Sequence, residues 1–336
     1  MRSMATEAIA PSRRGLLLGL AALPLFGAAA MAETSLALLA CGGDAEGQAS
    51  FGLDATGDVL WRHTLPGRGH GMAVAPDGRH AVISARRPGQ WLLQLDLVSG
   101  HSEIWPCDDL AYGGHVIYLD ATRLAATASD ADGQGCIAVL DANTGQRTAL
   151  WPTGGVDPHE LLLVKGALVV ANGGDALEPS NLARLDPRTG AMLARTEVPA
   201  ELRRLSLRHM AALPDGSVAV AAQDRGAADP AVPLLAFWHG ADIRWAALGT
   251  EQGGMRGYCG AVAALGQEKL CVTSPLGAQA VLHPAGNVLR LPDICGVTAL
   301  RGGFAISGGR GDLLLPDGSQ RRHAIAWDNH LHALAG

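Results

Sequence analysis

Residues 95–100 read LDLVSG, residues 140–145 read LDANTG and residues 185–190 read LDPRTG, so one short phrase occurs three times. Its aspartates fall at positions 96, 141 and 186, which gives a repeat of 45 residues. An aspartate side chain accepts hydrogen bonds from the backbone just after it, and glycine adopts the positive φ that closes a tight turn. Each phrase is therefore predicted to be a strand that ends in a tight turn.

A second phrase, Pro-Asp-Gly, occurs at residues 76–78, 214–216 and 316–318, each time between apolar runs. It is typical of a hairpin turn. Between Gly71 and Gly100, the two phrases punctuate the runs GMAVA, HAVISA and WLLQLDL. Together they predict units of four strands in about 45 residues, which is the size of one propeller blade.

Each unit begins with a short polar or glycine-rich run that precedes its first apolar strand. Seven such openings are present, namely GRGHGMAVA, YGGHVIYL, VDPHELLLV, SLRHMAAL, RGYCGAVAAL, PDICGVTAL and WDNHLHAL. The last opening has no full blade after it, and the N-terminal strands at residues 35–65 have no opening of their own. We therefore expect an all-β, seven-bladed β-propeller whose N- and C-terminal strands share one blade and close the ring. Six or eight blades are the alternatives, because residues 221–250 are irregular.

One aligned position of these openings holds histidine or cysteine, residue types whose side chains are common metal ligands. The aligned residues are His70, His115, His159, His209, Cys259, Cys295 and His330. In a propeller the innermost strand of each blade lines the central channel, so these residues would surround one mouth of it. Imidazole and thiolate suit iron, copper or zinc better than calcium or magnesium.

The aligned position therefore predicts a transition-metal site. Its candidate ligands are His70, His115, His159, His209 and His330. Candidates for additional ligands, or for groups that orient the ligands, are Glu160, Arg208, Tyr258, Cys259, Cys295, Asp328 and Asn329.

Other interpretations of these residues stay open. A histidine at a blade opening can hydrogen-bond to the neighbouring blade and hold the ring together, as the Gly-His of WD repeats does. The hub could also bind a small organic ligand. Cys259 and Cys295 open adjacent blades, so they either bind metal, form a disulfide or are inert.

Residues 11–32 read PSRRGLLLGLAALPLFGAAAMA. The adjacent Arg13 and Arg14 precede an apolar run, and Ala30-Met31-Ala32 fits a cleavage site. We predict a twin-arginine signal peptide over residues 1–32, cleaved after Ala32, and a single propeller domain over residues 33–336 in the periplasm. An ordinary secretory signal and a retained membrane anchor are the alternatives. The apolar run is shorter than the roughly 20 residues that a spanning helix needs, so no membrane span is expected in the mature protein.

The composition and the missing motifs argue against several classes of function. The formal net charge is −6 and the chain has no basic patch, so nucleic acid is not an expected partner. No CxxCH motif is present, which argues against haem of the c type. No strand–GxGxxG–helix unit is present either, which argues against a nicotinamide cofactor.

Several phrases together resemble the domain of unknown function 1513 family: the leader, the Gly-His and Pro-His-Glu openings, LSLRH at 205–209, DICGV at 293–297 and WDNHL at 327–331. The resemblance covers nearly the whole mature chain. It implies a seven-bladed propeller found beside imelysin-like iron-binding proteins and di-haem peroxidase-like proteins, which would be its periplasmic partners. It therefore implies a role in iron acquisition.

The leading hypothesis is a periplasmic propeller that binds a transition metal, iron or alternatively copper, at the channel mouth and assists iron uptake. One alternative is a metal-dependent oxidoreductase or hydrolase that uses the same hub. The other is a scaffold that binds partner proteins and whose histidines are structural.

Overall fold

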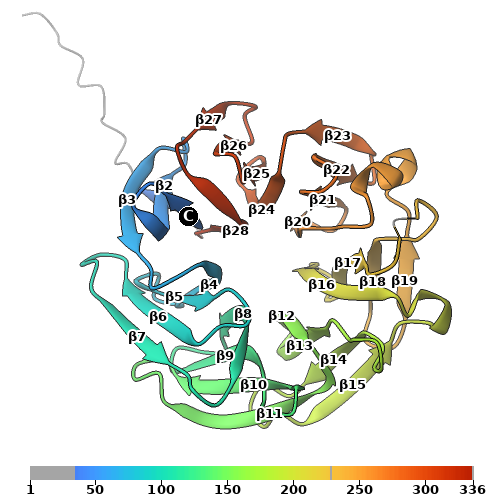
Figure 1. The fold of residues 1–336 in the computed structure, drawn as a ribbon, viewed down its shortest axis with the longest axis horizontal. Helices are drawn as coiled ribbons and strands as arrows, with labels where there is room; N and C mark the ends of the chain where they lie inside the picture. Colours follow the sequence, from blue (N-terminus) through green and yellow to red (C-terminus); the bar gives the residue numbers. More distant parts are fainter. Residues whose placement is uncertain (1–34, 228, 335–336) are drawn as a thin grey trace, which may run out of the picture. The chain divides into compact units, whose positions relative to one another are not determined.

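The computed structural model describes residues 35–227 and 229–334. Over these residues the chain forms seven four-stranded antiparallel sheets arranged in a ring (Figure 1). The predicted seven-bladed β-propeller is confirmed, and the alternatives of six or eight blades are wrong. The predicted signal peptide, with Arg13, Arg14 and the cleavage site after Ala32, lies outside the described residues.

Each blade runs from an innermost strand at the centre of the ring to an outermost strand at its rim (Figure 1). The innermost strands are β4 (Gly69–Val74), β8 (Ala111–Tyr118), β12 (Pro158–Val164), β16 (Leu205–Ala212), β20 (Ala261–Leu265), β24 (Ile294–Leu300) and β28 (Ala326–Ala333). The second strands are β1 (Leu36–Asp44), β5 (His80–Ala85), β9 (Arg123–Ser129), β13 (Ala167–Asn172), β17 (Val218–Asp224), β21 (Lys269–Ser274) and β25 (Gly303–Gly308).

The outer half of each blade is made by its third and outermost strands, and the outermost strands are the more exposed. The third strands are β2 (Gly47–Asp54), β6 (Trp91–Asp96), β10 (Gln134–Asp141), β14 (Asn181–Leu185), β18 (Leu235–Trp238), β22 (Gln279–His283) and β26 (Asp312–Leu314). The outermost strands are β3 (Val59–Thr64), β7 (Ser102–Pro106), β11 (Arg147–Val156), β15 (Met192–Glu197), β19 (Ile243–Ala246), β23 (Asn287–Arg290) and β27 (Gln320–Arg322). Two 3-10 helices lie in connections, η1 (Ala200–Leu202) and η2 (Gly249–Met255).

The two ends of the described chain meet in one blade. Strand β28 pairs with β1, and the register places Ala333 opposite Leu38 and Leu331 opposite Ala40. The last strand of the chain is thus the innermost strand of the blade that β1, β2 and β3 complete. This is the predicted ring closure, which pairs both terminal strands instead of leaving them as free edges. No helix among the described residues is long and apolar enough to cross a membrane.

The repeated phrase forms the predicted turns. Asp141 Oδ1 accepts hydrogen bonds from the backbone N–H groups of Asn143 and Thr144, both at 3.0 Å. The phrase then ends at Gly145, whose φ of 67° lies in the left-handed region that glycine adopts without strain. The Asp96 and Asp186 side chains accept the corresponding hydrogen bonds in their own blades.

The hydrophobic core forms a ring between the blades. In one of its clusters, Val82 of β5 and Leu92 of β6 pack with Leu124 of β9 and Ala138 of β10, which belong to the next blade. The second strands are covered on both faces, so β13 reads ALVVAN and is buried throughout, without polar alternation. Each fully buried Val or Leu contributes roughly 1.5–3 kcal/mol. Packing on both sides therefore fixes each blade and the innermost strand that it carries.

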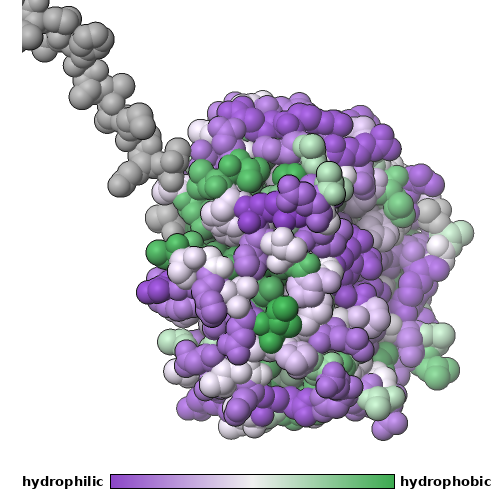
Figure 2. Space-filling view, turned by 60° about the vertical axis from the view of Figure 1, so that its left-hand side comes forward, coloured by the Kyte–Doolittle hydropathy of each residue, from purple (hydrophilic) through white to green (hydrophobic). Residues whose placement is uncertain are grey.

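The outermost strands carry scattered apolar side chains. The face shown in Figure 2 is mostly hydrophilic, and the hydrophobic residues on it form separate groups. Leu60 of β3, Ile104 of β7 and Leu150 of β11 are partly exposed on outermost strands. Scattered apolar residues of this kind are ordinary on protein surfaces. The residues with ligand and acid–base chemistry gather instead at the centre of the ring.

Candidate metal centre

Five consecutive innermost strands each contribute one histidine to the centre of the ring. Strands β28, β4, β8, β12 and β16 carry them, and the side chains are His330, His70, His115, His159 and His209. Neighbouring ring centroids lie 4.3 Å apart for His70 and His330, 4.8 Å for His115 and His159, and 4.7 Å for His159 and His209. The structure thus brings together all five histidines of the aligned position.

The pairing between innermost and second strands is irregular next to the histidines, and this irregularity sets where their side chains point. The register between β4 and β5 shifts between Gly69 and Met72, on either side of His70. The β8–β9 and β12–β13 registers shift between Tyr112 and Val116 and between Pro158 and Leu161, and the β16 and β28 ladders are interrupted near their histidines as well. A bulge bends the strand and re-aims a side chain. The repeated bulge explains how one histidine from each of five blades turns toward the same point.

Glycines beside the histidines allow the blades to approach closely. A Cβ on Gly71 would lie 2.6 Å from the carbonyl oxygen of Gly114, and one on Gly114 would lie 2.9 Å from Cδ2 of His70. Gly114 also has a φ of 100°, which L side chains rarely adopt. The glycines of these openings therefore make room for the histidines of the neighbouring blades.

Two pairs of imidazole nitrogens face each other at distances that suit a bound metal. The Nε2 atoms of His70 and His330 are 3.2 Å apart, and those of His159 and His209 are 3.4 Å apart. Two nitrogens that bind one tetrahedral ion at roughly 2.0–2.1 Å lie about 3.3–3.4 Å from each other. Without an ion, one nitrogen of each pair must carry a proton and donate it to the other.

The five histidines form two overlapping groups of three. In the first, His70, His115 and His159 offer ligand atoms that all lie within 4.8 Å of one another. In the second, the same holds for His115, His209 and His330. His115 belongs to both groups, so it is the residue on which any metal held at this point depends most.

Asp328 orients His70. Its Oδ1 is 2.7 Å from Nδ1 of His70, and its Oδ2 accepts a hydrogen bond from Nε of Arg68. Burial by itself would raise the pKa of Asp328, but the hydrogen bond from His70 and the charges of His70 and Arg68 hold it well below its usual range. The ionised carboxylate accepts, so Nδ1 of His70 carries the proton, and in a neutral ring Nε2 keeps its lone pair for a metal.

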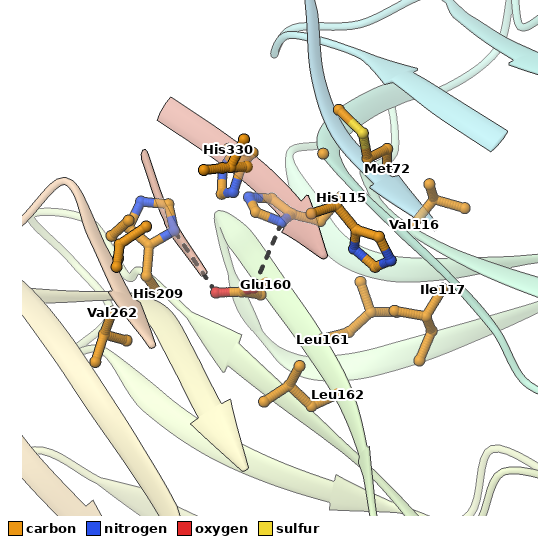
Figure 3. Close-up of a pocket in the computed structure, with 15 residues that line it drawn as sticks. Met72, His115, Val116, Ile117, Glu160, Leu161, Leu162, His209, Val262 and His330 are labelled. Carbon is orange, nitrogen blue, oxygen red and sulfur yellow. Dashed lines mark ion pairs between the residues drawn. The ribbon is translucent and has the colours of Figure 1, made fainter. Parts of the chain in front are cut away.

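Glu160 lies between two of the other histidines. One carboxylate oxygen is 3.9 Å from Nδ1 of His115, and the other is 3.6 Å from Nδ1 of His209 (Figure 3). The backbone N–H of Met210 donates to Oε2 at 2.6 Å. Burial raises the pKa of Glu160 to about 8, and the hydrogen bond from Met210 opposes that rise. The carboxyl group is thus placed to orient two imidazoles.

Burial keeps the histidines in the form that binds metals. The pKa values of His115, His159, His209 and His330 are all held well below the usual value, first because burial removes water from the charged ring. The neighbouring imidazoles oppose a second positive charge and lower the values further. These four rings are therefore neutral at pH 7, and neutral imidazole is the ligand form.

Several of these buried nitrogens have no hydrogen-bond partner in the described part of the chain. They are Nε2 of His115, Nδ1 of His159 and Nδ1 of His209. Most buried polar atoms in proteins are hydrogen-bonded, and the exceptions need an explanation such as an ion or an ordered water. Histidines that only held the blades together would have their bonds within the fold. In His159 and His209 the unpartnered Nδ1 is the other ring nitrogen from the Nε2 that faces the cluster. The unpartnered Nε2 of His115 is the atom that fits a bound metal better than a purely structural role.

A cavity of about 190 Å³ lies beside the cluster. His115, His209, His330 and Glu160 face it, together with apolar side chains such as Leu161 and Val262 (Figure 3). His332, two residues after His330 on β28, also lines it. Next to the candidate ligands there is thus room for a small molecule or for several waters.

The structure does not bring the two aligned cysteines to the cluster. Cys259 and Cys295 are both buried, and all six cysteines of the described chain are free, so the two do not form the disulfide considered above. The Cys259 thiol points to the carbonyl of Leu234, and the Cys295 thiol to that of Asp328. Burial raises the pKa of both thiols to about 12.

The remaining candidates lie around the cluster. Arg208 is buried and its Nη1 is 2.8 Å from Oδ2 of Asp157. Asn329 donates its backbone N–H to Oδ1 of Asp328 at 2.8 Å. Tyr258 donates its backbone N–H to Met255. Among the described residues, no hydrogen bond joins the side chain of Arg208, Tyr258 or Asn329 to one of the five histidines.

Sequence reasoning missed the charged residues that lie behind the aligned position. Arg68 pairs with Asp328, and Arg87 pairs with Asp157 from a different blade. These contacts join residues that are 260 and 70 positions apart. The one signal present was the position of Arg68 and Asp157 two residues before an aligned histidine.

Comparisons with known proteins give a family by sequence and a fold by structure. The family model described as "Protein of unknown function (DUF1513)" matches residues 63–334. No protein in the curated set matches the sequence.

Among solved structures, a hydrazine synthase of Kuenenia stuttgartiensis is similar with a TM-score of 0.64 and 12% identity, over 84% of this chain and 95% of that chain. The β-propeller domain of Cps50 (Swd1) of Myceliophteria thermophila gives 0.58 and 11%, over 78% and 87%. The WD40 repeats of RRP9 give 0.55 and 14%, over 82% and 88%. At such identities the likeness shows the propeller fold alone.

Proposed function

The chain belongs to the DUF1513 family, and we propose that it binds a transition-metal ion through the five histidines at the hub of its propeller. One observation carries the proposal. Imidazoles from five blades face one another, with Nε2 separations of 3.2 Å between His70 and His330 and 3.4 Å between His159 and His209, and the buried Nε2 of His115 has no partner in the described chain. That combination suits a cation better than a set of hydrogen bonds.

The donor set narrows the choice of metal. Imidazole suits iron, copper, zinc and nickel, whereas calcium and magnesium require oxygen ligands. Asp328 places an ionised carboxylate beside the imidazoles, and Glu160, whose pKa is raised to about 8, would add a second when it loses its proton to a nearby ferric ion. We propose iron as the metal, with copper as the alternative.

We further propose that the protein is exported by the twin-arginine route and assists iron acquisition in the periplasm. The sequence of residues 11–32 supports export, and the family resemblance supports partners of the imelysin-like and di-haem peroxidase-like classes. Such a protein would bind iron and pass it on. Fractionation of cells that express the natural sequence, compared with an Arg13→Lys/Arg14→Lys variant, tests the export step.

Metal content tests the central proposal. The protein is purified from its natural compartment without an affinity tag, and metals are quantified by elemental mass spectrometry. We expect close to one equivalent or more of iron or copper in the wild type, and its loss in His115→Ala/His159→Ala. The matched control is His101→Ala/His239→Ala, which removes two exposed histidines outside the cluster. A wild type that stays free of metal after incubation with ferrous, ferric and cuprous ions would overturn the proposal.

The cavity favours a second candidate function, a metal-dependent oxidoreductase or hydrolase. A metal enzyme needs an open coordination position and a pocket for its substrate. The cavity of about 190 Å³ is faced by three histidines of the cluster and by Glu160. A small substrate in it would therefore lie next to the metal ligands and to an acid–base group. Turnover that requires added metal and is lost in Glu160→Gln, with metal content retained, would favour this function over metal binding alone.

A further inference from the structure

A second pocket, of about 390 Å³, lies next to the histidine cluster. Two arginines, Arg86 and Arg87, line it together with Tyr112, Ser129 and Asp157. Two of its lining residues are close in sequence to histidines of the cluster: Pro158 precedes His159, and Gly113 lies two residues before His115. None of the functions proposed above uses this pocket.

The charge balance of the pocket is positive. Asp157 is the one acidic residue that lines it, and its two oxygens are paired with different guanidinium groups. Oδ1 pairs with Nη1 of Arg87, and Oδ2 lies 2.8 Å from Nη1 of Arg208. Arg208 lies outside the pocket, and its positive charge, like that of Arg87, is paired with the single negative charge of Asp157. Three guanidinium groups, of Arg86, Arg87 and Arg208, thus face one carboxylate, and the excess of positive charge favours a bound anion on a chain whose formal net charge is −6.

The donors of these arginines are only partly used. Among the described residues, the only hydrogen bond of the Arg87 side chain goes to Asp157, although a guanidinium has five N–H donors. The Arg208 side chain is 9% exposed, and its Nε has no hydrogen-bond partner in the described chain. Asp157 itself holds a φ of 54°, a conformation that non-glycine residues rarely adopt outside functional sites and turns.

We propose that this pocket binds a small polycarboxylate anion and that the protein receives its metal as the chelate of that anion. A guanidinium fork matches the two oxygens of a carboxylate, and Arg86 and Arg87 are neighbours that can meet two carboxylates of one molecule. Small-molecule sites typically measure roughly 300–1,000 Å³, so the pocket accepts a molecule larger than inorganic phosphate, which shares the oxyanion chemistry. The part of the proposal that concerns metal delivery rests on the proposed function, whereas the anion site does not.

Anion binding is measured first, on metal-free protein. Isothermal titration calorimetry with citrate should show saturable binding to one site of the wild type. Arg87→Gln should weaken it about tenfold or more, because a charge-assisted hydrogen bond is lost. The matched control is Arg147→Gln, since Arg147 is 35% exposed and paired with Asp109, as Arg87 is 34% exposed and paired with Asp157. Binding to this control should stay within about twofold of the wild type, because a distant surface pair contributes little.

Several results would overturn the polycarboxylate site. They are the absence of saturable citrate binding, an equal affinity in Arg87→Gln, and phosphate binding as tight as that of citrate with the same dependence on Arg87. Arg86→Lys is a second variant that keeps the charge but loses the guanidinium fork, and it should bind citrate more weakly. Circular dichroism spectra and thermal melts establish that each variant is folded.

Metal delivery is measured separately, as the rate of iron loading from ferric citrate and from the ferrous aquo ion. Arg87→Gln should slow loading from ferric citrate about tenfold and leave loading from the aquo ion unchanged within about twofold. Equal slowing from both sources would overturn the delivery role. Citrate binding that depends on Arg87, in a wild type that loads iron from neither source, would disprove the proposed function while supporting the anion site.

Discussion

At the same position of the repeat, five blades carry a histidine and two carry a cysteine, and the two kinds of blade, called here histidine blades and cysteine blades, place that side chain differently. In the histidine blades, the ring of each side chain turns into the centre, as for His115 of β8 and His209 of β16. In the cysteine blades, the thiols of Cys259 and Cys295 turn into the core and contact backbone carbonyls. The register of β24 shifts beside Cys295 much as it does in the histidine blades, so the bulge alone does not make a ligand.

The comparison teaches that a shared repeat position gives a shared place, and that the surroundings decide the role. Asp328 and Glu160 lie within reach of the Nδ1 atoms of three histidines. The cysteines instead meet carbonyl oxygens, which are acceptors that do not stabilise a thiolate, and burial raises their pKa to about 12. Four predictions test this division between the blades.

Removal of the shared histidine should have the largest effect. His115 belongs to both groups of three, so His115→Ala takes a ligand from each. We expect metal affinity to fall by more than the roughly 10–100-fold that loss of an orienting group costs. Competition with a chromogenic chelator measures the affinity, and the exposed His101→Ala is the control. An unchanged affinity would mean that the five histidines do not act as ligands.

Loss of an orienting group should have the next largest effect. Asp328→Asn keeps the shape of the side chain but removes the negative charge that accepts from His70 and Arg68. We expect metal affinity to fall about 10–100-fold, with the metal still bound at high concentration. The same competition assay measures it, and Asp96→Asn, in a turn of β6, is the control. If both variants bind as the wild type does, Asp328 has no part in the site.

Replacement of a cysteine should cost stability without loss of metal. Cys259 is fully buried in the largest apolar cluster, and its thiol faces the carbonyl of Leu234. Cys259→Ala should lower the free energy of unfolding by about 1 kcal/mol, the usual size for a small core truncation. Urea denaturation measures the stability, and elemental analysis measures the metal. A loss of bound metal in a folded Cys259→Ala protein would show that the cysteine blades do contribute to the site.

The smallest effect should be on thiol chemistry. With a pKa of about 12, only roughly one in ten thousand of the Cys259 and Cys295 thiols is ionised at pH 8, and both are buried. Neither should react with iodoacetamide in the native protein, whereas both should react after unfolding in guanidinium. Peptide mass spectrometry gives the site of labelling. Rapid labelling of either cysteine in the native state would contradict its place in the core.

The sequence by itself determined the number of blades and the residue that each blade places at the aligned position. The phrase around Asp96, Asp141 and Asp186 repeats because one turn geometry recurs, and the openings align because each begins an innermost strand. Repeats of this kind stack side by side, so a count of openings was enough to predict seven blades and the shared terminal blade. The same alignment was enough to predict that the five histidines gather at the centre of the ring.

Only the tertiary structure decided which aligned residues face one another. Whether a side chain at a blade opening turns inward or into the core depends on the local bulge, on glycines such as Gly114 and on the neighbouring blade. Cys295 and His70 occupy equivalent positions of the repeat. The thiol of Cys295 nevertheless contacts the backbone carbonyl of Asp328, whereas the ring of His70 contacts the carboxylate of the same residue. The arginine pairs of Asp157 join different blades, and no local pattern records them. Periodicity sets where a residue lies along the chain, whereas contacts between blades set what its side chain touches.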